Sequence, residues 1–234
     1  MSIITAFDAA SLSYDGAAQI QAEVAARLIG DVAGSPHSIL DIGCGTGLLT
    51  AMAQQRWPDA KITGIDAAPA MLVKARAKLP TARFVEADAV DLRLSERFDL
   101  ILSSMVLHWL ADPTAVLTRW QALLAPGGRL HVAVPVAGSL SEWKAHCARE
   151  GVVDRLWPFP ERAAFAAEGE IRRHIAVYDC ALDFLRSLHE TGANSSAPQS
   201  PPMRPAALRK ILRRASQPFA VGFAVAYLQL SSLQ

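Results

Sequence analysis

The stretch "ILDIGCGTGLLTAMA" (residues 39–53) joins an apolar, strand-like run to a helix-like pattern through a loop with three glycines. Glycines at such a turn allow the backbone to come close to a ligand and leave the first N–H groups of the helix free. The stretch therefore predicts a ligand-binding turn at the carboxyl edge of a sheet.

The spacing of the glycines separates two classes of ligand. Gly43, Gly45 and Gly47 occupy alternate positions, and Leu48 stands where the dinucleotide pattern G-x-G-x-x-G has its third glycine. Asp66 ends the next predicted strand, where a carboxylate accepts hydrogen bonds from ribose hydroxyls. A ligand with a ribose, an adenine and a positive end in place of phosphates would also suit Asp41, beneath the loop. These features favour S-adenosylmethionine over a nicotinamide dinucleotide.

Strand-like and helix-like segments alternate as far as residue 135. The predicted strands are 38–42, 61–66, 82–88, 98–104 and 129–135, and the predicted helices are 17–29, 48–56, 69–78 and 113–124. This alternation predicts an α/β fold, a doubly wound and mostly parallel sheet covered on both faces. Asp88 ends the third strand on the same edge as Asp66.

After Gly138 the pattern changes. Helices are predicted at 139–150, 160–168, 181–190 and 205–216, and further strands at 171–179 and 219–230, which makes seven strands. Residues 191–203, which begin with "TGANSSAPQSPP", are rich in Ser, Pro and Asn, and we predict that they form a linker.

Composition excludes several classes of function. The net charge of +1 gives no general attraction to nucleic acid or to an anionic membrane. The longest apolar run, 219–228, is too short to span a bilayer, and the first residues lack the features of a secretory signal. Three widely spaced cysteines fit reduced thiols, and no metal-ligand spacing is present. We expect a cytoplasmic, monomeric protein without a metal.

Five motifs resemble, in order, those of the class I S-adenosylmethionine-dependent methyltransferases: "LDIGCGTG", "GIDAAPAML", "VEADAVDL", "FDLILSSMVLHWL" and "LAPGGRL". The resemblance covers residues 35–135 and implies a Rossmann-like methyltransferase fold, with S-adenosylmethionine as cofactor and S-adenosylhomocysteine as product. The cofactor-binding positions that we expect are Tyr14, Asp41, Gly43, Cys44, Gly45, Asp66, Ala67, Met71, Asp88, Ala89 and Ser104.

A narrower resemblance covers nearly the whole chain. "AFDAASLSYDGAAQIQAEVAARL", "GSLSEW", "FLRSLHETGAN" and "FAVGFAVAYLQL" are similar to segments of the malonyl-acyl-carrier-protein O-methyltransferases of biotin synthesis. It implies methylation of the free carboxylate of a malonyl thioester, carried by acyl-carrier protein or coenzyme A. It also implies one domain, with an N-terminal helical lid in 1–34, a cofactor-binding core in 35–137, and a C-terminal helical insertion and final strands in 138–234.

Three residues are candidates for a catalytic role. Tyr14, in the segment that by resemblance forms the lid, could place its ring beside the sulfonium or be an ordinary surface residue. His108 could be a base, but a carboxylate acceptor is already deprotonated, so we favour a residue that shapes the acceptor pocket. Trp109 could line that pocket or belong to the core. Arg155 and Arg186 are candidates for binding the acceptor carboxylate, or are solvated surface arginines.

Two further residues can be interpreted as structural and not as functional. Cys44 is interpreted as a small residue of the glycine loop and not as a nucleophile. Met71 could line the adenosine pocket or belong to the core.

Two alternatives to this function are a methyltransferase that acts on another small acid or on a protein side chain, and a binding module without activity. The complete set of glycines and aspartates argues against the last. The basic helix at 205–216 places Arg209 and Arg213, and Lys210 and Arg214, four residues apart. It is either a solvated helix or a docking surface for an acidic carrier protein.

Overall fold

The structure is a computed structural model that describes residues 2–194, 204–215 and 217–232. The N-terminal helices are α1 (Ile3–Ala10), α2 (Tyr14–Ala17) and α3 (Gln19–Gly30). The parallel strands are β1 (Ser38–Ile42), β2 (Lys61–Asp66), β3 (Arg83–Glu86), β4 (Phe98–Ser104) and β5 (Leu124–Pro135). The helices between them are α4 (Leu48–Arg56), α5 (Pro69–Lys78), the 3₁₀ turn η1 (Leu107–Trp109) and α6 (Pro113–Gln121). The C-terminal elements are α7 (Ser141–Arg149), η2 (Arg162–Ala164), β6 (Glu168–Tyr178), α8 (Ala181–Glu190), α9 (Pro205–Arg214) and β7 (Phe219–Ser231).

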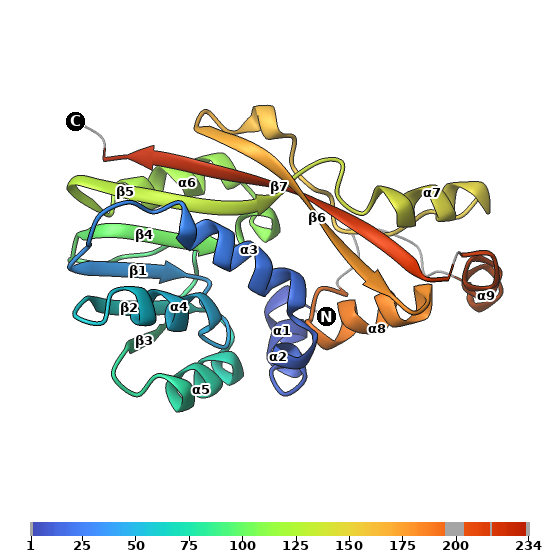
Figure 1. The fold of residues 1–234 in the computed structure, drawn as a ribbon, viewed down its shortest axis with the longest axis horizontal. Coiled ribbons are helices and arrows are strands. Elements are labelled where there is room, and N and C mark those ends of the chain that lie inside the picture. Colours follow the sequence, from blue (N-terminus) through green and yellow to red (C-terminus); the bar gives the residue numbers. More distant parts are fainter. Residues whose placement is uncertain (1, 195–203, 216, 233–234) are drawn as a thin grey trace.

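The described strands form one seven-stranded sheet in the order β3-β2-β1-β4-β5-β7-β6. Strands β1 to β5 are parallel, whereas β7 runs antiparallel to both of its neighbours (Figure 1). The chain order reverses between β1 and β4, so the loops after these two strands open at one edge. This reversal is where open α/β sheets bind ligands. The predicted doubly wound, mostly parallel sheet is confirmed.

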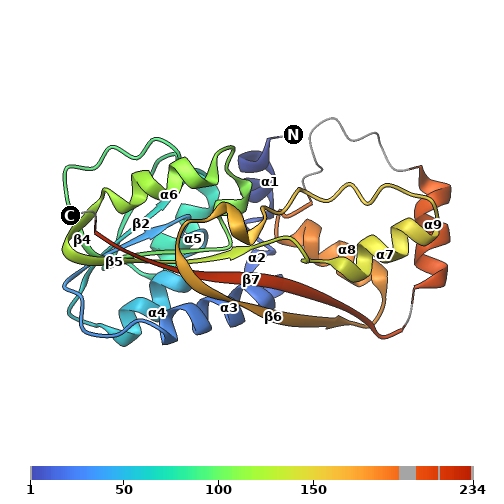
Figure 2. The ribbon, with the colours of Figure 1, turned by 90° about the horizontal axis from the view of Figure 1, so that it is seen from above.

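Two hydrophobic cores cover the two faces of the sheet. Consecutive residues of β1 point to opposite faces: Ile39 packs with α3 and α4, and Leu40 packs with α6. Figure 2 shows α6 on one side of the sheet and α3 and α4 on the other. Trp120 of α6 is fully buried and donates its indole N–H to the carbonyl of Ala89 at 2.8 Å. This bond ties the loop after β3 to the second core.

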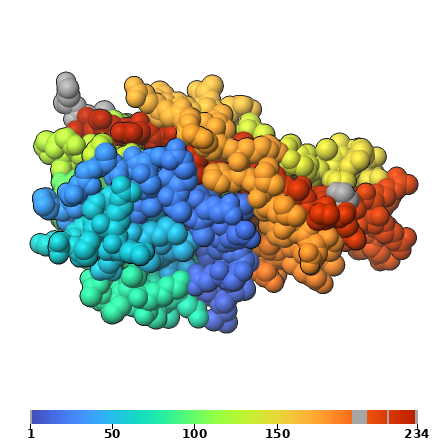
Figure 3. All heavy atoms as spheres, viewed as in Figure 1, coloured from blue at the N-terminus to red at the C-terminus, as the bar shows by residue number. Residues whose placement is uncertain are grey.

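Strands β6 and β7 extend beyond the parallel part of the sheet, and α7, α8 and α9 pack around that extension (Figures 1 and 2). Its core consists of Trp143, Phe184, Ile211 and Phe219, each at most 2% exposed. In the space-filling view the N-terminal helices lie between α5 and α8 (Figure 3). The chain therefore forms two adjoining regions, with the N-terminal helices between them.

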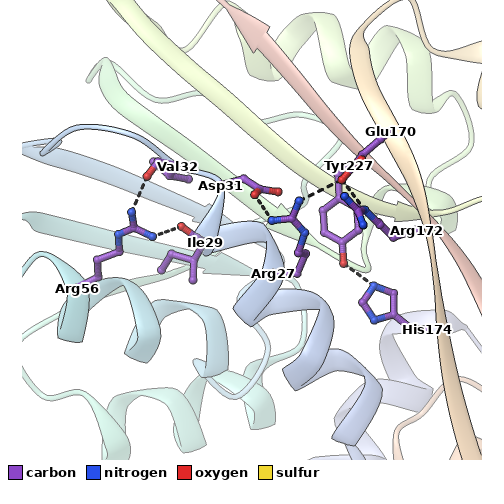
Figure 4. Close-up of polar contacts among 9 residues, drawn as sticks. All are labelled: Arg27, Ile29, Asp31, Val32, Arg56, Glu170, Arg172, His174 and Tyr227. Carbon is purple, nitrogen blue, oxygen red and sulfur yellow. Dashed lines mark hydrogen bonds and ion pairs between the residues drawn. The ribbon is translucent and has the colours of Figure 1, made fainter.

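Helix α3 is bound to both regions by polar contacts (Figure 4). Arg56 of α4 donates to the carbonyl of Val32 at 2.6 Å, directly after α3. Arg27 of α3 pairs with Glu170 of β6 at 3.1 Å. On the same side, Tyr227 of β7 and His174 of β6 are joined at 2.7 Å. These contacts fix α3 across the junction between the parallel strands and the extension.

Several predicted boundaries were wrong. The helix expected at 160–168 is only the short turn η2: Phe165 is buried in the second core, Arg162 donates to the carbonyls of Phe165 and Ala167, and β6 begins at Glu168. Helix α6 ends at Gln121, and residues 125–128 interrupt the pairing of β5 with β4. Strand β3 ends at Glu86, two residues before Asp88. Of the predicted linker, residues 195–203 lie outside the described residues.

Among the described residues, no group of three or more His, Cys, Asp or Glu side chains could hold a metal ion. None of the described helices is both long and apolar enough to cross a membrane.

Candidate active site

The glycine loop between β1 and α4 is held against β2. Its three glycines have φ values of 73°, 54° and 84°, which favour glycine. The N–H groups of Gly43 and Cys44 donate to the carbonyl of Ile65 at 2.7 and 2.9 Å. A Cβ at Gly43 would lie 2.3 Å from Val106, whereas a Cβ at Gly45 would meet no atom within 4 Å. The loop is packed on one side and open at Gly45.

Asp66 and Asp41 lie at different depths beside this loop. The carboxylate of Asp66 accepts from the N–H of Gly45 and of Ala68, each at 2.8 Å, and burial raises its pKa in spite of these bonds. Asp41 is 1% exposed and accepts from the hydroxyl of Thr50 at 2.6 Å. Burial raises the pKa of Asp41 to about 7. Asp66 borders open space, and Asp41 supports the loop from within.

A cleft of about 260 Å³ opens at this edge of the sheet; we refer to it as the edge cleft. Most of the expected cofactor positions line it: Tyr14, Gly43, Gly45, Asp66, Ala67, Met71, Asp88, Ala89 and Ser104. Asp41 and Cys44 do not. The lining also includes residues that sequence reasoning did not identify, of which Ile3, Ile4 and Phe7 belong to α1.

Three residues of this region show how burial decides between alternatives. Cys44 packs against Leu72 and Phe84, and burial raises its pKa well above the ordinary value, which makes it a poor nucleophile. Met71 is 1% exposed and also lines the edge cleft, so its two predicted roles coincide. The buried hydroxyl of Ser104 has no hydrogen-bond partner among the described residues.

A second, smaller cavity of about 60 Å³ adjoins the edge cleft; we refer to it as the aromatic cavity. The two share Phe7, Tyr14, Met105 and Trp109. The remaining lining residues of the aromatic cavity are Gln21, His108, Pro135, Leu140, Leu156, Trp157, Phe159, Leu188, Ala193 and Phe223. Within the described part of the chain, no Lys, Arg, Asp or Glu side chain lines this cavity.

His108 is buried in the wall of the aromatic cavity. It is 6% exposed, and its ring lies 5.7 Å from that of Phe159. Its Nδ1 has no partner among the described residues, and burial lowers its pKa to about 3. The backbone carbonyl of His108 accepts from the indole N–H of Trp157 at 3.0 Å. The imidazole is therefore neutral near pH 7.

Trp109 stands between the two cavities. Its ring centroid lies 5.8 Å from Phe7, 5.5 Å from Trp157 and 4.5 Å from His108. It is only partly buried and lines both cavities, so it forms a wall and not part of the closed core.

Comparisons with known proteins agree with this architecture. A family model described as "Methyltransferase domain" matches residues 40–130. The crystal structure of the YcgJ protein from Bacillus subtilis superposes with a TM-score of 0.62 over 90% of this chain and 98% of that one, at 17% identity. The chain carries a class I methyltransferase domain.

Two curated relatives share this methyltransferase domain. A trans-aconitate 2-methyltransferase from Escherichia coli O1:K1 / APEC is 46% identical over 97 residues, 42% of this chain and 38% of the relative. The biotin biosynthesis bifunctional protein BioCD from Bordetella avium (strain 197N) is 34% identical over 224 residues, 91% of this chain and 48% of the relative. The chain thus spans less than half the length of either of these relatives.

The two candidate arginines occupy different surroundings in the methyltransferase domain. Arg155 has a φ of 61°, and its buried Nε has no partner among the described residues. Arg155 is itself not among the residues that line either cavity, but it directly precedes Leu156 and Trp157, which line the aromatic cavity. Arg186 is exposed on α8, pairs with Asp183 at 2.8 Å and lines neither cavity. We retain only Arg155 as a candidate for binding an acceptor.

Sequence reasoning also missed the residues of the methyltransferase domain that hold its N-terminal helices in place. Asp8 and Asp15 accept hydrogen bonds from Ala70 and Thr46, across 62 and 31 residues of chain. Trp157 and Phe159 were missed because they lie in an irregular segment, which has no periodicity to read.

Proposed function

We propose that this domain transfers a methyl group from S-adenosylmethionine to the free carboxylate of a malonyl thioester on acyl-carrier protein or coenzyme A. The observation that carries the proposal is the aromatic cavity, whose described lining is uncharged and contains a neutral, buried histidine. Trans-aconitate has three carboxylates, which would require several cationic partners. An acyl thioester with one carboxylate suits this lining better.

The edge cleft fits S-adenosylmethionine on three observations. The buried Ser104 hydroxyl on its wall has no partner among the described residues, the space at Gly45 is open, and Asp66 has carboxylate lone pairs for ribose hydroxyls. Asp66 would hold the ribose, Asp88 the adenine amine, and the ring of Tyr14 would lie beside the sulfonium. When bound, this cofactor supplies an electrophilic methyl group, and the products are a methyl ester and S-adenosylhomocysteine.

The acceptor side fits a reaction without proton transfer. A useful general base has a pKa near the working pH, whereas burial lowers the pKa of His108 to about 3. A carboxylate needs no base, unlike a hydroxyl or an amine. The domain would then act by excluding water and aligning the carboxylate with the methyl group. Arg155 is the candidate counter-charge, since its buried Nε lacks a partner among the described residues.

The relatives support this acceptor to different extents. Similarity to the BioCD protein extends over 91% of this chain, whereas similarity to trans-aconitate 2-methyltransferases extends over 42% to 56%. The longer match includes most of the C-terminal region that lines the aromatic cavity. The shorter matches support a small acid as the second candidate acceptor.

The test is methyl transfer to four acceptors at equal concentration: malonyl- and succinyl-carrier protein, malonyl-coenzyme A and trans-aconitate. Mass analysis would identify the methylated species. We expect a methyl ester on the malonyl thioesters and little product with trans-aconitate. Efficient methylation of trans-aconitate with none of the malonyl thioesters would contradict the proposal.

A further inference from the structure

The N-terminal segment, residues 3–17, is attached to the glycine loop through one side chain. Asp15 of α2 accepts from the hydroxyl of Thr46 at 2.6 Å, and its other oxygen lies 2.5 Å from Nζ of Lys78. Thr46 belongs to the loop and is 1% exposed. Burial opposes the charge on Asp15, yet the bonds from Lys78 and Thr46 outweigh it and hold its pKa below the ordinary value.

Two more contacts complete the attachment. Asp8 of α1 accepts from the N–H of Ala70 at 2.7 Å, in the first turn of α5, whose last residue is Lys78. Both ends of α5 therefore hold the segment. On the other side, Ser13 donates to the carbonyl of Glu190 at 2.8 Å, at the end of α8.

Hydrophobic packing of the segment is slight. Helix α1 buries only Ala6 and Ala10, and α2, which is described throughout, has no buried residue. Alanine burial contributes little area, and besides it the ring of Phe7 lies 5.8 Å from that of Trp109, so we expect the polar contacts to contribute much of what keeps the segment docked. Phe7 and Tyr14 nevertheless line both cavities. The position of the segment thus sets the wall between them.

We propose that Asp15 is a positioning residue that docks the N-terminal segment on the glycine loop and thereby places Phe7 and Tyr14 between the two cavities. Loss of this contact loosens the edge cleft and the aromatic cavity together. The proposal rests on the proposed function only for the identity of the ligands in the two cavities. The contacts that dock the segment are all within this chain.

The experiment compares Asp15→Ala and Thr46→Val with Thr46→Ser, which keeps the hydroxyl donor. Glu96→Gln is the matched control, because Glu96 also pairs with one basic residue, Arg83 at 2.7 Å, on an exposed surface away from both cavities. Three quantities are measured: the dissociation rate of S-adenosylhomocysteine, KM and kcat for malonyl-carrier protein, and hydrogen exchange of residues 3–17 without ligand.

We expect Asp15→Ala and Thr46→Val to speed dissociation about tenfold and to raise the acceptor KM, with kcat at saturation within about twofold of wild type. Thr46→Ser and Glu96→Gln should behave as wild type. Unchanged dissociation and unchanged exchange in Asp15→Ala would overturn the role of Asp15.

The hydrogen-exchange measurement separates this inference from the proposed function. If wild type does not bind S-adenosylhomocysteine, the proposed cofactor is wrong, while faster exchange of residues 3–17 in Asp15→Ala still supports the docking role. Equal exchange in the two proteins overturns that role whatever the ligand.

Discussion

The parallel part of the sheet and the antiparallel extension build their cavities by different means. At the carboxyl edge of β1 and β2, backbone geometry shapes the edge cleft: positive-φ glycines, and N–H groups that bind Asp66. Where the extension joins the parallel part, side chains from distant segments shape the aromatic cavity, among them Trp109, Trp157 and Phe223. Backbone-built sites tolerate little substitution, whereas side-chain walls can change with the acceptor.

Gly43→Ala should destabilise the parallel part of the sheet and has the largest expected effect. The new Cβ would meet Val106 at 2.3 Å in a residue with a φ of 73°, so strain and overpacking add. We expect a loss of about 2–5 kcal/mol in the free energy of unfolding, with loss of S-adenosylhomocysteine binding. Denaturant unfolding and calorimetry check both effects.

Gly127→Ala is the control for that variant. Gly127 has a φ of 77°, but a Cβ there would meet no atom within 4 Å. We expect backbone strain alone to lower the free energy of unfolding by about 1–2 kcal/mol, with ligand binding retained. Equal losses in the two variants would show that the close approach at Gly43 is unimportant.

Asp66→Ala should weaken the cofactor without affecting the aromatic cavity. It removes the proposed acceptor for two ribose hydroxyls and leaves the N–H groups of Gly45 and Ala68 without their partner. We expect binding of S-adenosylhomocysteine to weaken by about 1–3 kcal/mol by calorimetry, while the acceptor KM at saturating cofactor changes little. Tighter binding of NAD than of S-adenosylhomocysteine by wild type would refute the assigned ligand.

The same contrast explains which elements could be predicted from the sequence and which could not. The bounds of β1, β2, α4 and α5 were correct, because local spacing and glycine positions determine them. The helix expected at 160–168 was wrong, because burial of Phe165 in the second core, a tertiary contact, overrides the helix propensity of the neighbouring alanines. The range 1–34 holds three helices where one lid helix was expected. The contact from Asp15 to Thr46 has no local signal, since it depends on how α2 packs.

Replacement of His108 should change stability more than chemistry. The unfolded chain takes up a proton at this residue below about pH 6.5, whereas the folded protein does so only near pH 3. The unfolded state therefore binds more protons in this window, and stability is lost as the pH falls from about 6.5 towards 3. His108→Gln should remove about 1.4 kcal/mol per pH unit of that acid sensitivity.

Turnover of His108→Gln should remain close to that of wild type, without an activity limb near pH 6.5. His131→Gln is the matched control, because burial lowers the pKa of His131 to about 4 but His131 lines neither cavity. It should reduce acid sensitivity similarly and leave the acceptor KM unchanged. A loss of more than about a hundredfold in turnover of His108→Gln, with both substrates bound, would assign it as a base.

The smallest expected effect concerns α9, at the far end of the extension. Its four basic residues are all exposed, but Lys210 and Arg214 pair with Glu150, directly after α7, at 2.8 and 3.0 Å, whereas Arg209 and Arg213 form no ion pair with another described residue. Leu208, Ile211 and Leu212 pack on the core. The helix is thus held by its apolar face and by Glu150, and we expect Arg209 and Arg213 to be the pair that meets an acidic carrier protein.

Reversal of Arg209 and Arg213 to Glu should therefore leave the fold and the cofactor affinity intact. We expect the KM for malonyl-carrier protein to rise about threefold to tenfold at low salt, and the difference to shrink as salt screens the contact. Activity on a short malonyl thioester should hardly change, because that substrate lacks the acidic surface. The charge-matched control reverses Arg83 and Arg93, which are exposed on the parallel part. If both double reversals change carrier-protein kinetics equally, net charge and not α9 guides the partner.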